Sequence, residues 1–154
     1  MDRIDKRILT LLQKDATMPV AEIGKKVGLT TTPCWRRIQN LEEKGIIDKR
    51  VTLLDPTKVN AGVTVFVSIR TSNHNADWLK RFSKVTSEFP QVVEMYRMSG
   101  DVDYLLRVVV PDIEAYDDFY RKLIAVIDIT DVSSSFAMEQ MKYTTELPLD
   151  HVLE

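Results

Sequence analysis

The sequence predicts an α+β protein with an N-terminal winged helix-turn-helix and a C-terminal ferredoxin-like βαββαβ sandwich. Three observations support this fold class. Apolar residues recur at helical spacing in three short segments before residue 46. After residue 62, four strand-like runs and two helical runs follow in the order β-α-β-β-α-β. A polar junction containing Pro56 and Gly62 separates the two patterns. We therefore expect a domain at 1–54, a linker at 55–62 and a second domain at 63–154.

Two helices open the first domain. Residues 2–14 form a predicted helix in which Asp2 is a suitable N-cap. A second helix begins at Pro19 and ends at Gly28, which can supply a left-handed C-terminal residue. Gly24 interrupts that helix at a cost of about 1 kcal/mol relative to alanine. We expect it to permit close packing of the following helix.

The third helix begins at Thr30 and is closed by Gly45. Its buried stripe has the spacing i, i+4, i+7 and consists of Cys34, Ile38 and Leu41. Packing is the expected role of the Cys34 thiol, because buried thiols are usually inert. Residues 46–54 read as a short hairpin or wing.

The outward end of the third helix combines small hydroxyls, an aromatic ring and two arginines. In a helix-turn-helix this end reaches base edges in the major groove, and arginine can bond guanine in bidentate fashion. The alternative is an ordinary solvated face, but large aromatics such as Trp35 are seldom left exposed without a partner. The predicted residues for binding double-stranded DNA are Thr31, Thr32, Pro33, Trp35, Arg36, Arg37 and Asn40.

Charge is divided unevenly along the chain. Residues 1–60 carry a net charge of +4, and residues 61–154 carry −6. A basic N-terminal part favours a polyanionic partner, although ordinary scatter of charge can give the same split.

The second domain is predicted from alternating periods. Strands are expected at 63–70, 92–98, 104–110 and 131–141, with a hairpin turn at 99–103. One helix carries Trp78, Phe82, Val85 and Phe89 at helical spacing and ends at Pro90. The other opens at residues 111–112, and its predicted apolar face is Ile113, Tyr116, Tyr120, Leu123 and Ile127.

Two helices can cover only one face of a four-stranded sheet. We expect Phe66 and Phe136 on the uncovered face, which needs another surface to bury it. Sheet-to-sheet homodimerisation is the simplest solution, because two-fold dimers are the commonest assemblies.

Composition narrows the class of protein further. One cysteine excludes an internal disulfide, and no run approaches the roughly 18 apolar residues of a membrane span. The charged first residues lack the apolar core of a signal peptide. We expect a cytoplasmic protein without membrane association. The sequence contains no phosphate loop, metal-ligand cluster or catalytic constellation, so no cofactor, metal or catalytic residue is predicted.

The chain resembles the Lrp/AsnC, or feast/famine, family of transcriptional regulators over essentially its whole length. The runs that carry this resemblance are LTLLQKDA (9–16), GLT (28–30), RRIQNLEEKGII (36–47) and SGDVDYLL (99–106). Within the family, TTPCW (31–35), AMEQ (137–140) and KYTT (142–145) resemble a branch that regulates cysteine detoxification or other amino-acid breakdown.

The resemblance implies a sequence-specific regulator of amino-acid metabolism whose C-terminal domain senses a small effector, an amino acid. Such proteins form homodimers and often octamers, with effector sites between subunits near the turn after the second strand. Carried over here, the candidate effector-binding residues are Gly100, Asp101 and Asp103, with Ser134 as a further candidate. Backbone amides at a glycine turn suit a ligand carboxylate, and an aspartate suits its ammonium group. Good turn chemistry alone explains Gly100 and Asp101 equally well without the resemblance.

The sequence leaves three alternatives open. An enzyme could use the carboxylates of Asp101 and Asp103, but no base or nucleophile of another type accompanies them. An architectural DNA-binding protein would lack an effector. A metabolic sensor could instead use its basic helix to bind a protein.

Overall fold

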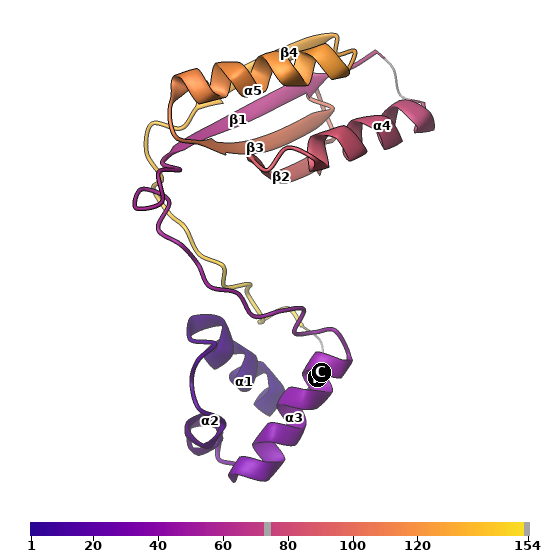
Figure 1. Ribbon diagram of the computed structural model, residues 1–154. Helices are drawn as coiled ribbons and strands as arrows, with labels where there is room; N and C mark the ends of the chain where they lie inside the picture. The colour runs from indigo at the N-terminus through magenta and orange to yellow at the C-terminus, as the bar shows by residue number, and fades with distance from the viewer. Residues whose placement is uncertain (73–74, 153–154) are drawn as a thin grey trace. The chain divides into compact units, whose positions relative to one another are not determined.

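The computed structural model describes residues 1–72 and 75–152 and divides into two compact units (Figure 1). The first unit contains Met1–Thr52 together with the C-terminal segment that starts at Lys142, and the second is Leu53–Met141. The sequence placed that C-terminal segment in the second domain. Instead, the Gln13 side chain makes two hydrogen bonds with the backbone of Leu147, and Leu149 packs against the apolar core of the first unit.

Three helices form the first unit: α1 (Arg3–Lys14), α2 (Val20–Val27) and α3 (Thr31–Glu43). Asp2 caps α1 as predicted and forms a reciprocal capping box with Asp5. Gly28 ends α2 with φ 81°. The predicted buried stripe of α3 is also confirmed, because Cys34, Ile38 and Leu41 are all buried in one core. Burial raises the pKa of the Cys34 thiol, which agrees with its predicted packing role.

Gly24 is buried where α2 meets the turn and α3. A Cβ built at this position would lie 2.8 Å from the carbonyl oxygen of Leu29 and 3.5 Å from Cβ of Cys34. The Leu29 amide also donates to the carbonyl of Gly24 at 2.8 Å. The absence of a side chain therefore lets the turn fold onto α2. The sequence predicted a close approach to the following helix, but the close approach is to this turn, because the distance to Cys34 is an ordinary van der Waals contact.

The predicted wing is not formed. No part of residues 46–54, all of which the structure describes, belongs to a strand. Val51, Leu53 and Leu54 are more than half exposed there. A two-stranded hairpin without a third strand or a packed helix is marginally stable at best, which explains the irregular segment.

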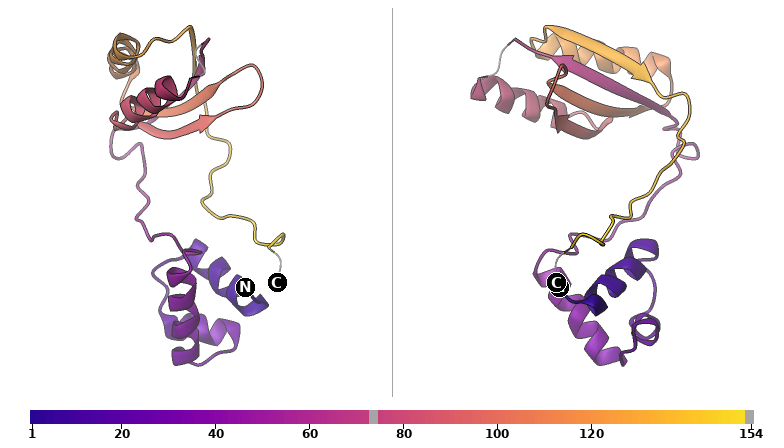
Figure 2. Two further views of the ribbon diagram at one scale, coloured as in Figure 1. Left: turned by 90° about the vertical axis from the view of Figure 1, so that its right-hand side faces the viewer. Right: turned by 180° about the vertical axis from the view of Figure 1, so that it is seen from behind.

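The second unit contains one four-stranded antiparallel sheet in the order β2-β3-β1-β4. Its strands are β1 (Val63–Arg70), β2 (Val92–Arg97), β3 (Tyr104–Val110) and β4 (Asp131–Phe136). The helices α4 (Ala76–Ser87) and α5 (Ile113–Val126) lie on the same face of the sheet (Figures 1 and 2). This arrangement confirms the predicted α+β class and the βαββαβ order. No helix within the described residues is both long and apolar enough to cross a bilayer.

Three details of the second unit differ from the sequence prediction. The strand β4 ends at Phe136 rather than at Met141. The Ala137 amide still donates to the Thr64 carbonyl oxygen, but β1 begins at Val63, so residues after 138 have no position of β1 opposite them. Phe136 is opposite Val65, so strand alternation places it on the helix-covered face, where it packs edge-on against Tyr116. Ile113 is 70 % exposed, because the buried stripe of α5 begins one turn later and consists of Tyr116, Phe119 and Leu123.

Candidate nucleic-acid interface and effector turn

The seven predicted DNA-binding residues occupy different positions around the axis of α3, and Pro33 is exposed in its first turn. Thr32, Arg36 and Asn40 follow one another at four-residue intervals and are exposed. Thr31 and Trp35 form a neighbouring exposed row, and the Trp35 side chain is 50 % exposed. These positions form one continuous outward surface.

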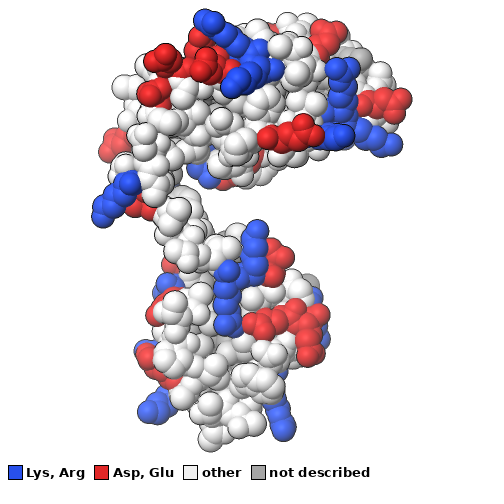
Figure 3. All heavy atoms as spheres, in the orientation of Figure 1, with Lys and Arg blue, Asp and Glu red and all other residues white. Residues whose placement is uncertain are grey.

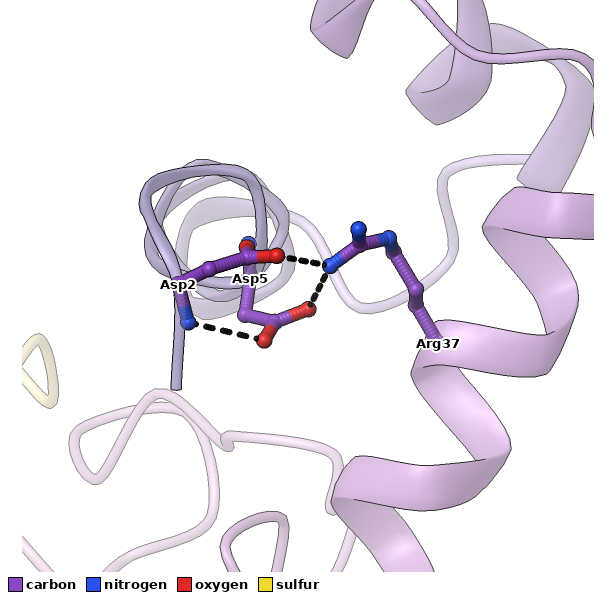
Figure 4. A network of polar contacts seen from close by, with 3 residues as sticks. All are labelled: Asp2, Asp5 and Arg37. Atoms are coloured by element: carbon purple, nitrogen blue, oxygen red, sulfur yellow. Dashed lines mark hydrogen bonds and ion pairs between the residues drawn. The ribbon is translucent and has the colours of Figure 1, made fainter. Parts of the chain in front are cut away.

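Arg37 departs from this surface because it lies next to the buried stripe. Its Nη1 is 2.6 Å from Oδ2 of Asp2 and 2.8 Å from Oδ1 of Asp5, so it clamps α3 to the first turn of α1 (Figure 4). The hydrogen bonds that Arg37 donates to the carboxylates of Asp2 and Asp5 raise the pKa of its guanidinium. Hydrogen bonds to the Asp2 carboxylate lower its pKa. The largest effect comes from the backbone amide of Asp5, and the next comes from Arg37. Arg37 is therefore occupied within the first unit.

Arg36 has no such partner. Among residues 1–72 and 75–152, no ion pair or side-chain hydrogen bond engages its guanidinium. The outward surface of α3 thus combines a free cation, an aromatic ring, two threonine side chains and the Asn40 amide. Such groups can bond phosphates and the edges of bases.

Arg7 joins α1 to α2, a role that the sequence did not single out. Its Nη2 donates to the carbonyl oxygen of Lys26 at 2.6 Å, in the last turn of α2. A cation at a helix C-terminus satisfies a carbonyl and opposes the helix dipole. Its spacing in α1 marks it only as an exposed residue, so the contact could be found only once α1 and α2 were packed.

The predicted effector residues fall into two separate groups. Gly100 adopts φ 109° in the turn between β2 and β3, a left-handed value that favours glycine. Asp101 is exposed beside it, and its carbonyl oxygen accepts a hydrogen bond of 2.9 Å from Nε of Arg70. The same guanidinium lies 3.6 Å from the carboxylate of Asp131. Arg70 was not predicted from the sequence, because only the pairing of β1 with β3 and β4 brings it to the turn.

Asp103 and Ser134 are engaged within the fold. The Asp103 carboxylate accepts from the backbone amide of Thr71 at 2.8 Å, which ties the end of β1 to the start of β3. The Ser134 hydroxyl forms a hydrogen bond with the Tyr116 hydroxyl on the helix-covered face. Ser134 is opposite Val67, three positions from the pairing of Arg70 with Asp131. Of the four predicted effector residues, only Gly100 and Asp101 are therefore exposed at the end of the sheet where Arg70 lies.

Across the described part of the chain, no set of three or more His, Cys, Asp or Glu side chains is close enough to hold a metal ion.

Comparison with known proteins gives matches over both units. Residues 1–42 match the AsnC-type helix-turn-helix domain, and residues 64–147 match the Lrp/AsnC ligand binding domain. The chain is 48 % identical over 151 residues to the DNA-binding transcriptional activator DecR of Escherichia coli, covering 97 % of this chain and 99 % of that protein. It is 50 % identical over 149 residues to the glutamate uptake regulatory protein of Zymomonas mobilis, covering 97 % and 91 %.

Solved structures match equally well over the full length. An AsnC family transcriptional regulator from Agrobacterium tumefaciens has a TM-score of 0.97 and 71 % identity, covering 99 % of this chain and 100 % of that one. A transcriptional regulator from Neisseria meningitidis in complex with L-Met has a TM-score of 0.94 and 32 % identity, covering 99 % of both chains. The fold and both of its units are therefore shared with proteins of known class.

Proposed function

Because the chain belongs to the Lrp/AsnC family of DNA-binding transcription regulators, we propose that it reads DNA with the outward surface of α3 and responds to an amino acid bound at the turn between β2 and β3. The protein is a DNA-binding regulator with a ligand-binding domain, and its relatives are regulators rather than enzymes. The proposal adds which residues do each task.

The proposed DNA contact depends on the different surroundings of two neighbouring arginines, Arg36 and Arg37. Arg37 is held by two carboxylates, whereas Arg36 is exposed and unpaired among the described residues. We therefore assign DNA contact to Thr31, Thr32, Pro33, Trp35, Arg36 and Asn40, and we assign Arg37 to positioning α3 against α1. Specificity then comes from base-edge contacts, and the cation adds affinity that depends on salt.

Replacing Arg36 tests this assignment. We expect Arg36→Ala to weaken binding to the gene's own upstream DNA about tenfold, since one good arginine contact is worth about 1–3 kcal/mol. The slope of log affinity against log salt should fall by about one if Arg36 contacts a phosphate. Gel-shift titrations at several salt concentrations measure both quantities. Arg121→Ala removes an exposed arginine from α5 and is the matched control. Wild-type affinity for Arg36→Ala would remove Arg36 from the interface.

The amino-acid effector is supported by the shape of the turn and by a relative. The Neisseria regulator was crystallised with L-Met, and another relative is named a glutamate uptake regulatory protein. In this chain, the Arg70 guanidinium suits a ligand carboxylate and the exposed Asp101 carboxylate suits an ammonium group. We propose that these two residues and Gly100 form the centre of the site. Asp103 holds the turn in place, and Ser134 lies in the wider surroundings of the site.

A thermal-shift screen of amino acids tests the effector site. A ligand at 100 times its dissociation constant should stabilise the folded protein by about 2.7 kcal/mol. Asp101→Ala should abolish that shift without lowering the melting temperature of the free protein, because no ion pair or hydrogen bond engages its carboxylate among the described residues. Asp112→Ala, which removes an exposed helix cap at another site, serves as the control. An unchanged ligand shift in Asp101→Ala would contradict the assignment, and no shift with any amino acid would favour an architectural protein.

The open face of the sheet supports the proposal of a homodimer, and higher assemblies are proposed as multiples of that dimer. Phe66 is 39 % exposed and Tyr96 is 50 % exposed on that face, where Leu105 and Val109 are half-buried. A second copy placed against it would bury these side chains and supply two DNA-binding units for half-sites one turn of the duplex apart. Sedimentation of Phe66→Glu should show smaller particles than the wild type. The resemblance to a cysteine-detoxification branch stays a prediction.

A further inference from the structure

A groove lies between α4 and the strands β2 and β3, on the helix-covered side of the sheet. Its volume is about 540 Å³, within the range of small-molecule sites. Leu79, Phe82, Met95 and Tyr104 supply an apolar floor. Phe82 and Tyr104 are buried and contact each other with ring centroids 4.8 Å apart. The floor is thus built on rigid core aromatics.

Three cations line this groove. Lys80 and Lys84 are one turn apart on α4, and Arg97 is at the end of β2. All three are exposed, and no ion pair or side-chain hydrogen bond engages their charged ends among residues 1–72 and 75–152. Lys and Arg side chains gather over the region of α4 on the face drawn in Figure 3.

This grouping stands out because residues 61–154 carry a net charge of −6 and contain nine Lys and Arg residues. Four of the nine have a partner among the described residues: Arg70, Arg81, Arg107 and Arg121. Three of the remaining five line the one groove. Like charges one helical turn apart repel each other, so Lys80 and Lys84 would gain from a bound anion.

We propose that this groove binds a small organic anion with an apolar body, of the aryl- or alkyl-carboxylate class. The floor would bury the body of the ligand, and the three cations would pair with its carboxylate. An amino acid fits poorly, because the lining contains no Asp or Glu to accept its ammonium group. The ligand class therefore differs from that of the proposed effector, and the site does not include Gly100 or Asp101.

Calorimetric titration of the full chain with 4-phenylbutyrate tests the inference. We expect saturable binding, and at least tenfold weaker binding of the neutral 4-phenylbutan-1-ol, which has the same apolar body. The double variant Lys80→Gln/Lys84→Gln should weaken binding of the acid about tenfold and leave the alcohol unaffected. Lys122→Gln, an exposed lysine on α5, is the matched control.

Two further outcomes separate this site from the effector turn. Asp101→Ala should bind 4-phenylbutyrate as the wild type does, whether or not the protein also binds amino acids or DNA. Loss of binding in Asp101→Ala would place the anion at the effector turn and overturn the inference. Equal binding of acid and alcohol, insensitivity to the double variant, or no binding at millimolar concentration would overturn it too.

Discussion

Replacing Gly24 by alanine sets two effects of similar size against each other. Alanine is favoured over glycine in a helix interior by about 1 kcal/mol. The added Cβ, however, would lie 2.8 Å from the Leu29 carbonyl oxygen, which must move by about 0.6 Å to reach an ordinary contact of 3.4 Å. That oxygen is a backbone atom in the turn between α2 and α3, so it cannot swing aside as a flexible side chain would.

We expect the steric effect to win. Overpacking a well-packed core costs about 1–3 kcal/mol, which leaves Gly24→Ala less stable than the wild type by about 1 kcal/mol. Such a loss increases the population of the opened unit, and therefore its amide exchange rate, about fivefold. DNA affinity should fall as well, because the turn sets the angle at which α3 is presented.

Hydrogen exchange measured by mass spectrometry on peptides from residues 20–41 reports this stability locally. Lys25→Ala, an exposed change in the same helix, should stay close to the wild type. Gly28 is a second comparison, because it has φ 81° and a Cβ added there would meet no atom within 4 Å. Asparagine, which tolerates that conformation, should be accepted at Gly28 but not at Gly24. Slower exchange in Gly24→Ala than in the wild type would refute the steric reasoning.

Two further predictions concern contacts that hold the first unit together. Asp2→Asn keeps a cap but removes the charge that faces Arg37. Because the pKa of Asp2 is lowered in the folded state, the wild type should be more stable than the variant above about pH 4. This difference in stability should disappear as the pH falls through the lowered pKa. Thermal unfolding followed by circular dichroism from pH 3 to 6 measures this difference, and a difference independent of pH would contradict the pairing. Gln13→Ala removes both hydrogen bonds to the backbone of Leu147, so exchange in residues 145–152 should become several-fold faster. Unchanged exchange there would contradict the role of Gln13 in holding the C-terminal segment.

Several elements could be predicted from the residues close to them in the sequence. The capping box at Asp2, the left-handed Gly28 and the stripe Cys34, Ile38 and Leu41 depend on neighbours within a few residues, and all were predictable. The alternating strands and the exposed Trp35 followed from the same short periods. The missing wing did not, because a hairpin signal says nothing of whether a third strand is available.

By itself the sequence determined the helices, the βαββαβ order of the second unit and the outward end of α3, but not the absence of the wing or the end of β4. The features that it determined depend on caps, turns and periodicity, which act over one or two turns of chain. The tertiary structure alone decided that Arg37 pairs with Asp2 and Asp5 while Arg36 has no partner in the described part of the chain, and that Arg70 reaches the turn at Asp101. It also decided that Phe136 faces the helices. Each of these contacts joins residues at least 20 positions apart, so it depends on how packed elements meet rather than on the pattern within any one of them.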